Sequence, residues 1–182
     1  QPVHRSSHAP PVYVMLEGNV GAGKTTLLAR LAAALQGDPG VVCMAEPVDL
    51  WREHGLLQRF YAGSLSPLAF QLVVLPTVAA PLARALHRRR VRLVITERSL
   101  RSNLSVFAEH NLDGQDAVAY RVAHAAMISG LPAHEPVTVW LDTPPAVCAA
   151  RALARARPEE HHLNAAFFQA LHDKHCALAS TT

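Results

Sequence analysis

The chain has 182 residues, of which 50% are hydrophobic, so its length and composition suit one closed core rather than two. Its 17 Lys and Arg against 14 Asp and Glu give a formal net charge of +3, which is too weak to indicate a nucleic-acid-binding protein. The three cysteines are scattered with no C-x-x-C spacing, which argues against a disulfide framework and favours a reducing compartment. We therefore expect a cytoplasmic protein, with a mitochondrial or nuclear location left open.

Two segments bear on whether the chain has an arm or a membrane anchor. Residues 1–11 are polar and contain prolines, so we predict a flexible arm ahead of one domain over residues 12–182. The longest apolar stretch, residues 70–83, is interrupted by Pro76 and Pro81 and falls short of the roughly 20 apolar residues of a membrane-spanning helix. We therefore expect no membrane association.

Short apolar runs predict four strands, each bounded by glycine, proline or charged residues. They are residues 12–16, 41–45, 91–96 and 137–141. Helical patterns alternate with them in chain order, over residues 24–35, 50–88, 100–130, 145–155 and 164–179, with breaks expected at Gly55, Gly63 and Pro67. Continuous apolar strands between long helices favour an α/β three-layer sandwich, in which a parallel sheet is flanked by helices on both faces.

A glycine-rich motif connects the first strand to the first helix. Residues 18–25 match the P-loop pattern G-x-x-x-x-G-K-[ST], and the strand before them and the helix after them are the context that this motif requires. Its backbone N–H groups can turn toward phosphate oxygens, Lys24 can reach the β- and γ-phosphates, and Thr25 can ligate Mg²⁺. The predicted nucleotide-binding residues of the loop are Gly18, Asn19, Val20, Gly21, Ala22, Gly23, Lys24, Thr25 and Thr26.

Polar residues at the ends of the other strands favour a small-molecule kinase over other P-loop proteins. Glu46 follows the second strand, where a carboxylate can accept the proton of an attacking hydroxyl; a helix cap or a surface acid is the alternative. Glu97 and Arg98 end the third strand and could serve Mg²⁺ and phosphate, or form a plain ion pair. Because the carboxyl ends of parallel strands share one edge, we expect these residues and Asp142 to surround one cavity.

Three arginines follow the fourth strand. Arg151 and Arg155 share one helix face, and Arg157 comes two residues later. Together they could neutralise a phosphoryl group in transfer, although a solvated amphipathic helix end is the alternative. Residues 158–160, Pro-Glu-Glu, break this helix and predict a mobile lid that excludes water.

Four motifs in this order resemble the deoxyribonucleoside kinases, the family of the cellular deoxycytidine kinases and mitochondrial thymidine kinases. They are Leu16 to Thr26, Glu46 to Arg52, Phe70-Gln71 and Glu97-Arg98-Ser99. The resemblance covers residues 12–178 and implies a kinase that uses ATP and Mg²⁺ to phosphorylate the 5′-hydroxyl of a deoxyribonucleoside in nucleotide salvage. It also implies a five-stranded parallel sheet and a homodimer.

The resemblance assigns roles to individual residues. Glu46 is expected to act as the general base, Arg98 to hold the 5′-hydroxyl and the incoming charge, and Glu97 to face the metal beside Thr25. The lid arginines Arg151, Arg155 and Arg157 are expected to bind phosphate, and Arg157 is counted with Lys24, Glu46 and Arg98 as catalytic. The expected substrate-binding residues are Glu46, Trp51, Tyr61, Gln71, Val74, Val78, Arg98, Asn103, Phe107 and Glu160, with a core role as the alternative for Trp51 and Phe107.

The chain also departs from the family pattern. Val78 and Asn103 stand where deoxycytidine-selective members carry an arginine and an aspartate, which leaves an uncharged pocket and favours thymidine or a broad pyrimidine range. Pro76 and Pro81 are expected to kink the helix that presents Gln71. Since the chain ends soon after the lid, we predict that the domain lacks the usual last strand.

Other functions stay open at this point. A nucleoside-monophosphate kinase has a similar loop and lid, but its acceptor site needs arginines for the substrate phosphate. A non-catalytic nucleotide-binding module is a further alternative, although the N-K-x-D segment of guanine-nucleotide switches does not occur. We expect no zinc site, because no carboxylate or thiolate completes a ligand set with the C-terminal histidines, which are His161, His162, His172 and His175.

Overall fold

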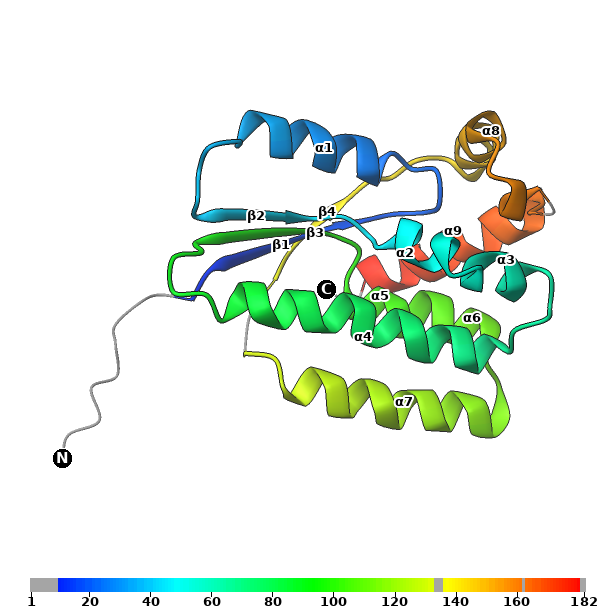
Figure 1. Cartoon of the computed structure of the whole chain (residues 1–182). Helices are drawn as coiled ribbons and strands as arrows, with labels where there is room; N and C mark the ends of the chain where they lie inside the picture. The colour runs from blue at the N-terminus through cyan, green and yellow to red at the C-terminus, as the bar shows by residue number, and fades with distance from the viewer. Residues whose placement is uncertain (1–9, 133–135, 162, 181–182) are drawn as a thin grey trace.

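The computed structural model describes residues 10–132, 136–161 and 163–180 of the chain (Figure 1). Its centre is a four-stranded, all-parallel sheet in the order β2-β3-β1-β4. The strands are β1 (Val12–Glu17), β2 (Val41–Met44), β3 (Leu93–Glu97) and β4 (Val137–Trp140). All four predicted strands are confirmed, with ends that move by no more than two residues.

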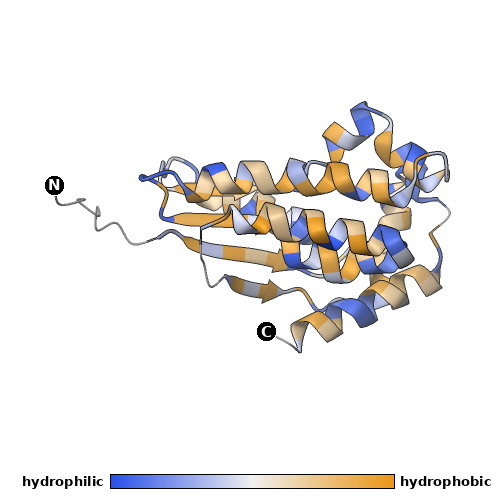
Figure 2. Cartoon of the chain, turned by 90° about the horizontal axis from the view of Figure 1, so that it is seen from below, coloured by the Kyte–Doolittle hydropathy of each residue, from blue (hydrophilic) through white to orange (hydrophobic). Residues whose placement is uncertain are grey.

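Helices cover both faces of the sheet, so the predicted α/β three-layer class is confirmed (Figure 1). On one face, Leu28 of α1 (Lys24–Ala34) packs with Leu16 and Ile95 of the central strands. On the other face, α4 (Pro67–Leu86) and α7 (Gly114–Ser129) form the main core with side chains of β1 and β3. Figure 2 shows the matching pattern, since the strands are mostly hydrophobic and the helices carry both hydrophobic and hydrophilic residues.

The helical region after β2 is divided where the sequence predicts. The three helices are α2 (Val48–Glu53), α3 (Leu56–Tyr61) and α4. Ser66 caps α4, because its side-chain oxygen accepts a hydrogen bond from the backbone N–H of Ala69, and Pro67 suits the first turn since it needs no N–H partner. The helix runs on through Pro76 and Pro81 without a break, so Gln71 sits on a continuous element.

The length of α4 corrects one expectation. Its 20 residues make it the one helix within the described ranges that could cross a membrane by length and composition. The two prolines were expected to interrupt this stretch, whereas the helix accommodates both. Core helices meet the same criterion, and α4 buries Leu75, Ala79 and Leu82 against the sheet.

The region after β3 differs from the single helical stretch that the sequence predicts. It contains α5 (Leu100–Ser102), a π-helical segment η1 (Asn103–Ala108) and α6 (Glu109–Asn111), before α7 begins. A π-helical turn shifts the side chains by one residue relative to an α-helix and is often found at functional sites. Asn103 and Phe107, both predicted site residues, lie in this segment.

The C-terminal part of the chain packs against the P-loop. Helix α8 (Pro145–Arg155) leads into the short 3₁₀ helix η2 (Pro158–Glu160), and α9 (Ala165–Ala179) follows. Cys148, Ala152 and Phe168 pack with Ala22 of the P-loop and so attach both helices to the nucleotide-binding end of the sheet. The predicted break at Pro158 is confirmed.

Candidate active site

A cavity of about 870 Å³ opens at the carboxyl edge of the sheet, within the range of small-molecule sites. Most of the predicted site residues line it, and they come from the P-loop, the ends of β2 and β3, helices α2 to α4, η1 and the lid. The predicted residues at the cavity are Val20, Gly21, Gly23, Lys24, Thr25, Thr26, Glu46, Trp51, Tyr61, Gln71, Val74, Glu97, Arg98, Asn103, Phe107, Arg151, Arg155, Arg157 and Glu160. Asp142 is exposed and does not line the cavity.

Backbone geometry explains the glycines of the P-loop. Gly21 has a φ of 79°, and a Cβ there would lie 2.4 Å from the carbonyl oxygen of Cys148. The residue must therefore be glycine for the loop to approach α8 so closely. Gly18, Asn19 and Ala22 do not line the cavity themselves.

Asn19 holds the loop in place. Its Nδ2 donates to the carbonyl oxygen of Phe168 at 2.8 Å, and its Oδ1 accepts from the backbone N–H of Val20 at 2.8 Å. Asn19 is buried, with 2% of its surface exposed, and its side chain connects the P-loop to α9. The motif places it among the residues expected to touch nucleotide, and the structure directs its side chain to the protein instead.

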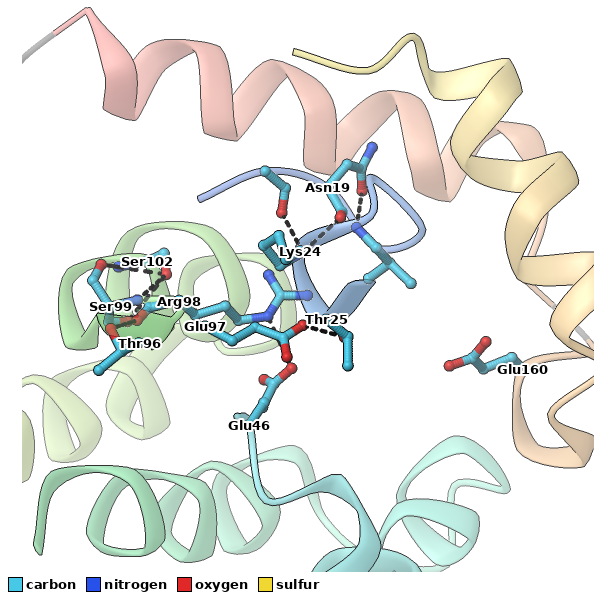
Figure 3. A network of polar contacts seen from close by, with 12 residues as sticks. Asn19, Lys24, Thr25, Glu46, Thr96, Glu97, Arg98, Ser99, Ser102 and Glu160 are labelled. Carbon is cyan, nitrogen blue, oxygen red and sulfur yellow. Dashed lines mark hydrogen bonds and ion pairs between the residues drawn. The ribbon is translucent and has the colours of Figure 1, made fainter. Parts of the chain in front are cut away.

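Lys24 is folded back onto its own loop. Its Nζ donates to the carbonyl oxygens of Gly18 at 2.8 Å and Asn19 at 2.7 Å (Figure 3). Burial, followed by the positive charge of Arg98, lowers the pKa of Lys24 to about 7. The Lys24 ammonium group therefore donates to two carbonyl oxygens of its own loop, and an anionic partner, which binds it more strongly, can replace them.

Thr25 and Glu97 form a pair of oxygen ligands beside the P-loop. Thr25 Oγ1 donates to Glu97 Oε1 at 2.8 Å (Figure 3). A hydroxyl and a carboxylate next to a phosphate-binding loop fit Mg²⁺, which takes few protein ligands and completes its shell with phosphate oxygens and water. Across the described part of the chain, no group of three or more His, Cys, Asp and Glu could hold a metal ion. His162 lies outside the described residues.

Glu46 and Arg98 meet in front of the P-loop. Arg98 Nε donates to Glu46 Oε2 at 3.1 Å, and the two side chains are 18% exposed for Glu46 and 6% exposed for Arg98. The Arg98 guanidinium lies 4.2 Å from the centre of the Phe107 ring, and its Nη1 is buried with no hydrogen-bond partner among the described residues. A buried donor without a partner, facing a cavity, is suited to an oxygen atom of a bound ligand.

The far end of the cavity is apolar with two buried amides. The ring of Trp51 contacts Phe70 edge to face at 5.8 Å, and its Nε1 donates to Thr77 at 3.1 Å. Gln71 and Asn103 are 3% and 2% exposed, and within the part of the chain that the structure describes, Gln71 Oε1 and Asn103 Nδ2 have no hydrogen-bond partner. An apolar slot with one free acceptor and one free donor suits a planar heterocycle with polar edges.

Val78 is the predicted base-pocket residue that the structure places elsewhere. Val74, one helical turn earlier on α4, lines the cavity, whereas Val78 does not. Instead Val78 packs against the hydrophobic clusters on either side of α4. The reason is geometric, because four residues along a helix correspond to a rise of about 6 Å and carry the side chain away from the cavity.

Charge pairs hold the lid. Glu160 Oε2 lies 2.6 Å from Arg155 Nη2, and Glu160 Oε1 lies 3.2 Å from Arg157 Nη1. Figure 3 shows Glu160 reaching from the lid into the space opposite Glu46 and Thr25. Burial, then the nearby charge of Glu160, raises the pKa of Tyr61 on α3, so its phenol stays protonated on this side of the cavity.

The neighbouring lid carboxylate reaches α2. Glu159 forms an ion pair with Arg52 at 2.8 Å, and Arg52 directly follows Trp51 of the cavity wall. On α8, Arg151 Nη1 donates to the carbonyl oxygen of Ala22 in the P-loop at 3.1 Å. The cavity is therefore bounded on one side by a lid whose charges are already paired.

Comparison with known proteins identifies the group to which this site belongs. A sequence model described as deoxynucleoside kinase matches residues 14–182. The chain belongs to the deoxynucleoside kinase family. This agrees with the family resemblance of the four motifs.

Individual relatives of this deoxynucleoside kinase differ in the activities for which they are named. It is 29% identical to a probable deoxycytidine kinase of fowlpox virus over 89% of this chain and 69% of the relative. It is 28% identical to a thymidine kinase of ictalurid herpesvirus 1 over 91% of this chain and 73% of the relative. It is also 32% identical to a thymidylate kinase of a Synechococcus strain over 84% of this chain and 74% of the relative.

The kinase cavity also contains residues that sequence reasoning missed. Phe60 and Phe70 line it near Gln71, and a search for apolar residues beside the predicted pocket helix could have found them. His110 and Asn111 line it because the π-helical turn brings α6 to the cavity, which no pattern in the sequence signals. The remaining unpredicted lining residues are Val48, Leu57, Pro67, Leu163, Asn164 and Phe167.

Proposed function

We propose that this member of the deoxynucleoside kinase family transfers the γ-phosphate of ATP to the 5′-hydroxyl of a deoxyribonucleoside, with thymidine or a broad range of pyrimidine deoxyribonucleosides as substrate. The observation that carries the proposal is the Glu46–Arg98 pair, which lines the same cavity as the P-loop and the apolar slot. A carboxylate at that point is close to a sugar whose base fills the slot and to a phosphate bound by the loop.

In the proposed phosphoryl transfer, Glu46, Lys24 and Arg98 each have one role. Glu46 accepts the proton of the 5′-hydroxyl as the oxygen attacks the γ-phosphorus, and the bond from that phosphorus to the β-phosphate oxygen breaks to release ADP. Lys24 leaves its two carbonyl partners and binds the phosphates. Arg98 offers its unpartnered Nη1 to the reacting oxygens, since it is already oriented by Glu46 and Phe107.

Two further groups support the same transfer. Mg²⁺, when bound, would neutralise charge on the phosphate oxygens, and Thr25 and Glu97 are the residues to hold it. Arg151, Arg155 and Arg157 add positive charge from the lid side, and Glu160 and Tyr61 bind the sugar 3′-hydroxyl. The ion pairs of the lid would have to rearrange as substrate enters.

The preference for pyrimidines rests on the uncharged slot. Gln71 and Asn103 carry amides, which can each donate and accept, so they suit the mixed edge of thymine without a carboxylate to select an amino group. The fowlpox and herpesvirus relatives are named as a probable deoxycytidine kinase and a thymidine kinase, both with pyrimidine substrates. This supports a pyrimidine site and leaves the choice between the two bases to experiment.

A thymidylate kinase is the second candidate, because one relative at 32% identity carries that name. Its substrate would bring a phosphate dianion to the acceptor position, where Glu46 places a carboxylate. The phosphate dianion and the Glu46 carboxylate would repel each other, so the site favours a neutral hydroxyl as the acceptor.

A substrate panel tests the proposal. Purified protein with Mg-ATP is given each of the four deoxyribonucleosides and thymidylate, and kcat/KM is measured for each. We expect at least one pyrimidine deoxyribonucleoside to exceed thymidylate by about 100-fold or more, on the order of the discrimination that a mismatched polar site imposes. Turnover of thymidylate alone would replace the proposal with the second candidate, and binding without turnover would favour a non-catalytic module.

We also propose a homodimer that packs through helices beside the sheet. Leu72 on α4 and Val118 and Val122 on α7 are exposed hydrophobic side chains on two helices that pack together. Exposed apolar side chains on neighbouring helices are candidates for a protein interface. Light scattering coupled to size-exclusion chromatography would give twice the chain mass of 19.7 kDa for the dimer, and the single mass would reject it.

A further inference from the structure

Arg98 has an unusual backbone. Its φ is 67°, in the left-handed region, and it shares this property with only one other non-glycine residue among those described, Ala156. A side chain with a Cβ is strained in this region and persists there only when its surroundings hold it. Arg98 lines the cavity, and its surroundings must keep its backbone in this strained conformation.

The backbone of Arg98 is held at both of its polar groups. Its N–H donates to the carbonyl oxygen of Leu16 on β1 at 2.9 Å. Its carbonyl oxygen accepts from Thr96 Oγ1 at 2.8 Å, a bond that reaches two residues along the chain (Figure 3). Since both groups are fixed, the left-handed conformation is defined by the two bonds rather than by the preference of the residue.

Thr96 brings a hydroxyl into a mostly apolar layer. It pairs with Met15 in the sheet, it is 4% exposed, and it lies on the face where Tyr13, Met15 and Val94 pack into the core under α4. A hydroxyl in such a layer is costly unless it is hydrogen-bonded. An apolar side chain would pack equally well there, so its packing does not explain the hydroxyl.

Tyr13 supplies the proton that Thr96 lacks. The Tyr13 hydroxyl lies 3.3 Å from Thr96 Oγ1, and because a threonine hydroxyl has one proton, which Thr96 donates to the Arg98 carbonyl, Tyr13 is the donor in the second bond. Burial raises the pKa of Tyr13 to about 12, which keeps its proton in place. Tyr13, Thr96 and the Arg98 carbonyl thus form a chain of two hydrogen bonds, in which each bond strengthens the other.

The residues after Arg98 are held by a separate contact. Ser99 and Ser102 form a reciprocal capping box, in which each side chain accepts from the other's backbone N–H, at 3.0 and 3.3 Å. This box starts α5 and leads into the π-helical segment with Phe107, the ring that lies against the guanidinium. Thr96 therefore fixes the Arg98 peptide from one side while the serine box fixes it from the other.

We propose that Thr96 is a positioning residue for phosphoryl transfer: its hydroxyl, supported by Tyr13, holds the Arg98 peptide in the left-handed conformation that directs the guanidinium to Glu46 and Phe107. Thr96 does not line the cavity, so it acts only through Arg98. The inference rests on the proposed function, because its consequence is read in the transfer rate. Without the hydroxyl, the carbonyl can turn, and the guanidinium moves away from the reacting oxygens.

The test compares four variants by steady-state kinetics. Thr96→Val keeps the shape and removes the hydroxyl, Thr96→Ser keeps the hydroxyl, Tyr13→Phe removes only the supporting donor, and Thr138→Val makes the same exchange on β4, away from the cavity. We expect Thr96→Val to lower kcat roughly 10- to 100-fold, as a misplaced catalytic group does, with little change in the KM of ATP and nucleoside. Thr96→Ser and Thr138→Val should stay near wild type, and Tyr13→Phe should lie between.

A double-mutant cycle decides whether the effect passes through Arg98. In an Arg98→Ala background, Thr96→Val should lower kcat no further, because the group that it positions is gone. An equal loss in both backgrounds, or wild-type kcat in folded Thr96→Val, would overturn the proposal. If Thr96→Val does not fold, Tyr13→Phe with wild-type kcat would overturn it equally.

A structural measurement separates this inference from the proposed function. If the wild-type protein phosphorylates no nucleoside, the proposed function fails, and crystal structures of wild type and Thr96→Val still test the positioning. We expect the variant to lose the positive φ of Arg98 and the contact with Glu46. An unchanged Arg98 in the variant would reject the role of Thr96 whatever the activity.

Discussion

Replacing Glu46 with glutamine removes a charge and a proton acceptor while it keeps the shape of the side chain. The amide oxygen can still accept from Arg98 Nε, which lies 3.1 Å from the carboxylate in the native protein. General-base catalysis contributes about 10²- to 10⁴-fold to a rate, so we expect kcat to fall by that factor in Glu46→Gln. The KM values of ATP and nucleoside should change little, because neither ligand depends on this charge for binding.

Glu46→Gln should also lower the free energy of unfolding by a small amount that can be estimated. Arg98 is 6% exposed and loses its nearest carboxylate, and a hydrogen bond to a charged group contributes about 1.5–3 kcal/mol. Glu97 and Glu17 remain near the guanidinium, and the amide keeps a neutral bond, so the free energy of unfolding should drop by the lower part of this range. The protein therefore stays folded, and lost turnover cannot be attributed to unfolding.

The assay couples ADP release to a spectrophotometric readout at saturating nucleoside, with urea unfolding measured on the same preparations. Glu53→Gln is the matched control, since Glu53 is an exposed residue of α2 that does not line the cavity. It should leave both kcat and stability unchanged. A Glu46→Gln protein that retains wild-type kcat would refute the role of Glu46 as general base and with it the assignment of the acceptor position.

Three further predictions follow from particular residues. Gly21→Ala should abolish ATP binding because its Cβ would meet the Cys148 carbonyl at 2.4 Å, whereas Gly37→Ala, with a φ of 90° and nothing within 4 Å, isolates the backbone strain alone; equal ATP affinities in calorimetry would contradict this. The pKa of Lys24 is lowered to about 7 by burial, so above pH 7 the binding of ATP to the charged ammonium must take up a proton; the Kd of ATP should rise with pH by up to about tenfold per unit, a slope that Lys24→Met should lack. Gln71→Leu should lower kcat/KM for pyrimidine nucleosides by roughly 10- to 100-fold, because it leaves polar base edges unpaired; an unchanged kcat/KM would remove Gln71 from base recognition.

The features of the fold that follow from local chemistry could be predicted from the sequence. The strand before Gly18, the helix after Lys24 and the stop at Pro47 each depend on neighbouring residues, so the P-loop and the sheet edge were both correctly expected. That Glu46 and Arg98 share one cavity also followed, because parallel strands end at a common edge.

What the sequence could not supply depends on contacts between distant residues. The π-helical turn at Asn103 and the burial of Asn19 against Phe168, 149 residues away, arise from packing that no local pattern encodes. Val78 does not line the cavity, and the sequence could not indicate this, because a resemblance gives a residue's place along a helix and not the depth at which that helix enters the cavity. The contacts of Lys24 with two carbonyl oxygens of its own loop depend on the path of the loop backbone, which the motif alone does not specify.

We propose that a hydroxyl of a nucleoside, rather than water or a nucleotide, receives the phosphate at Glu46. It is tested most directly by mass spectrometry and phosphorus NMR of the products after the protein is incubated with Mg-ATP and thymidine. We expect one thymidine 5′-monophosphate for each ADP formed. Free phosphate beside unchanged thymidine, with the other deoxyribonucleosides equally unchanged, would contradict it.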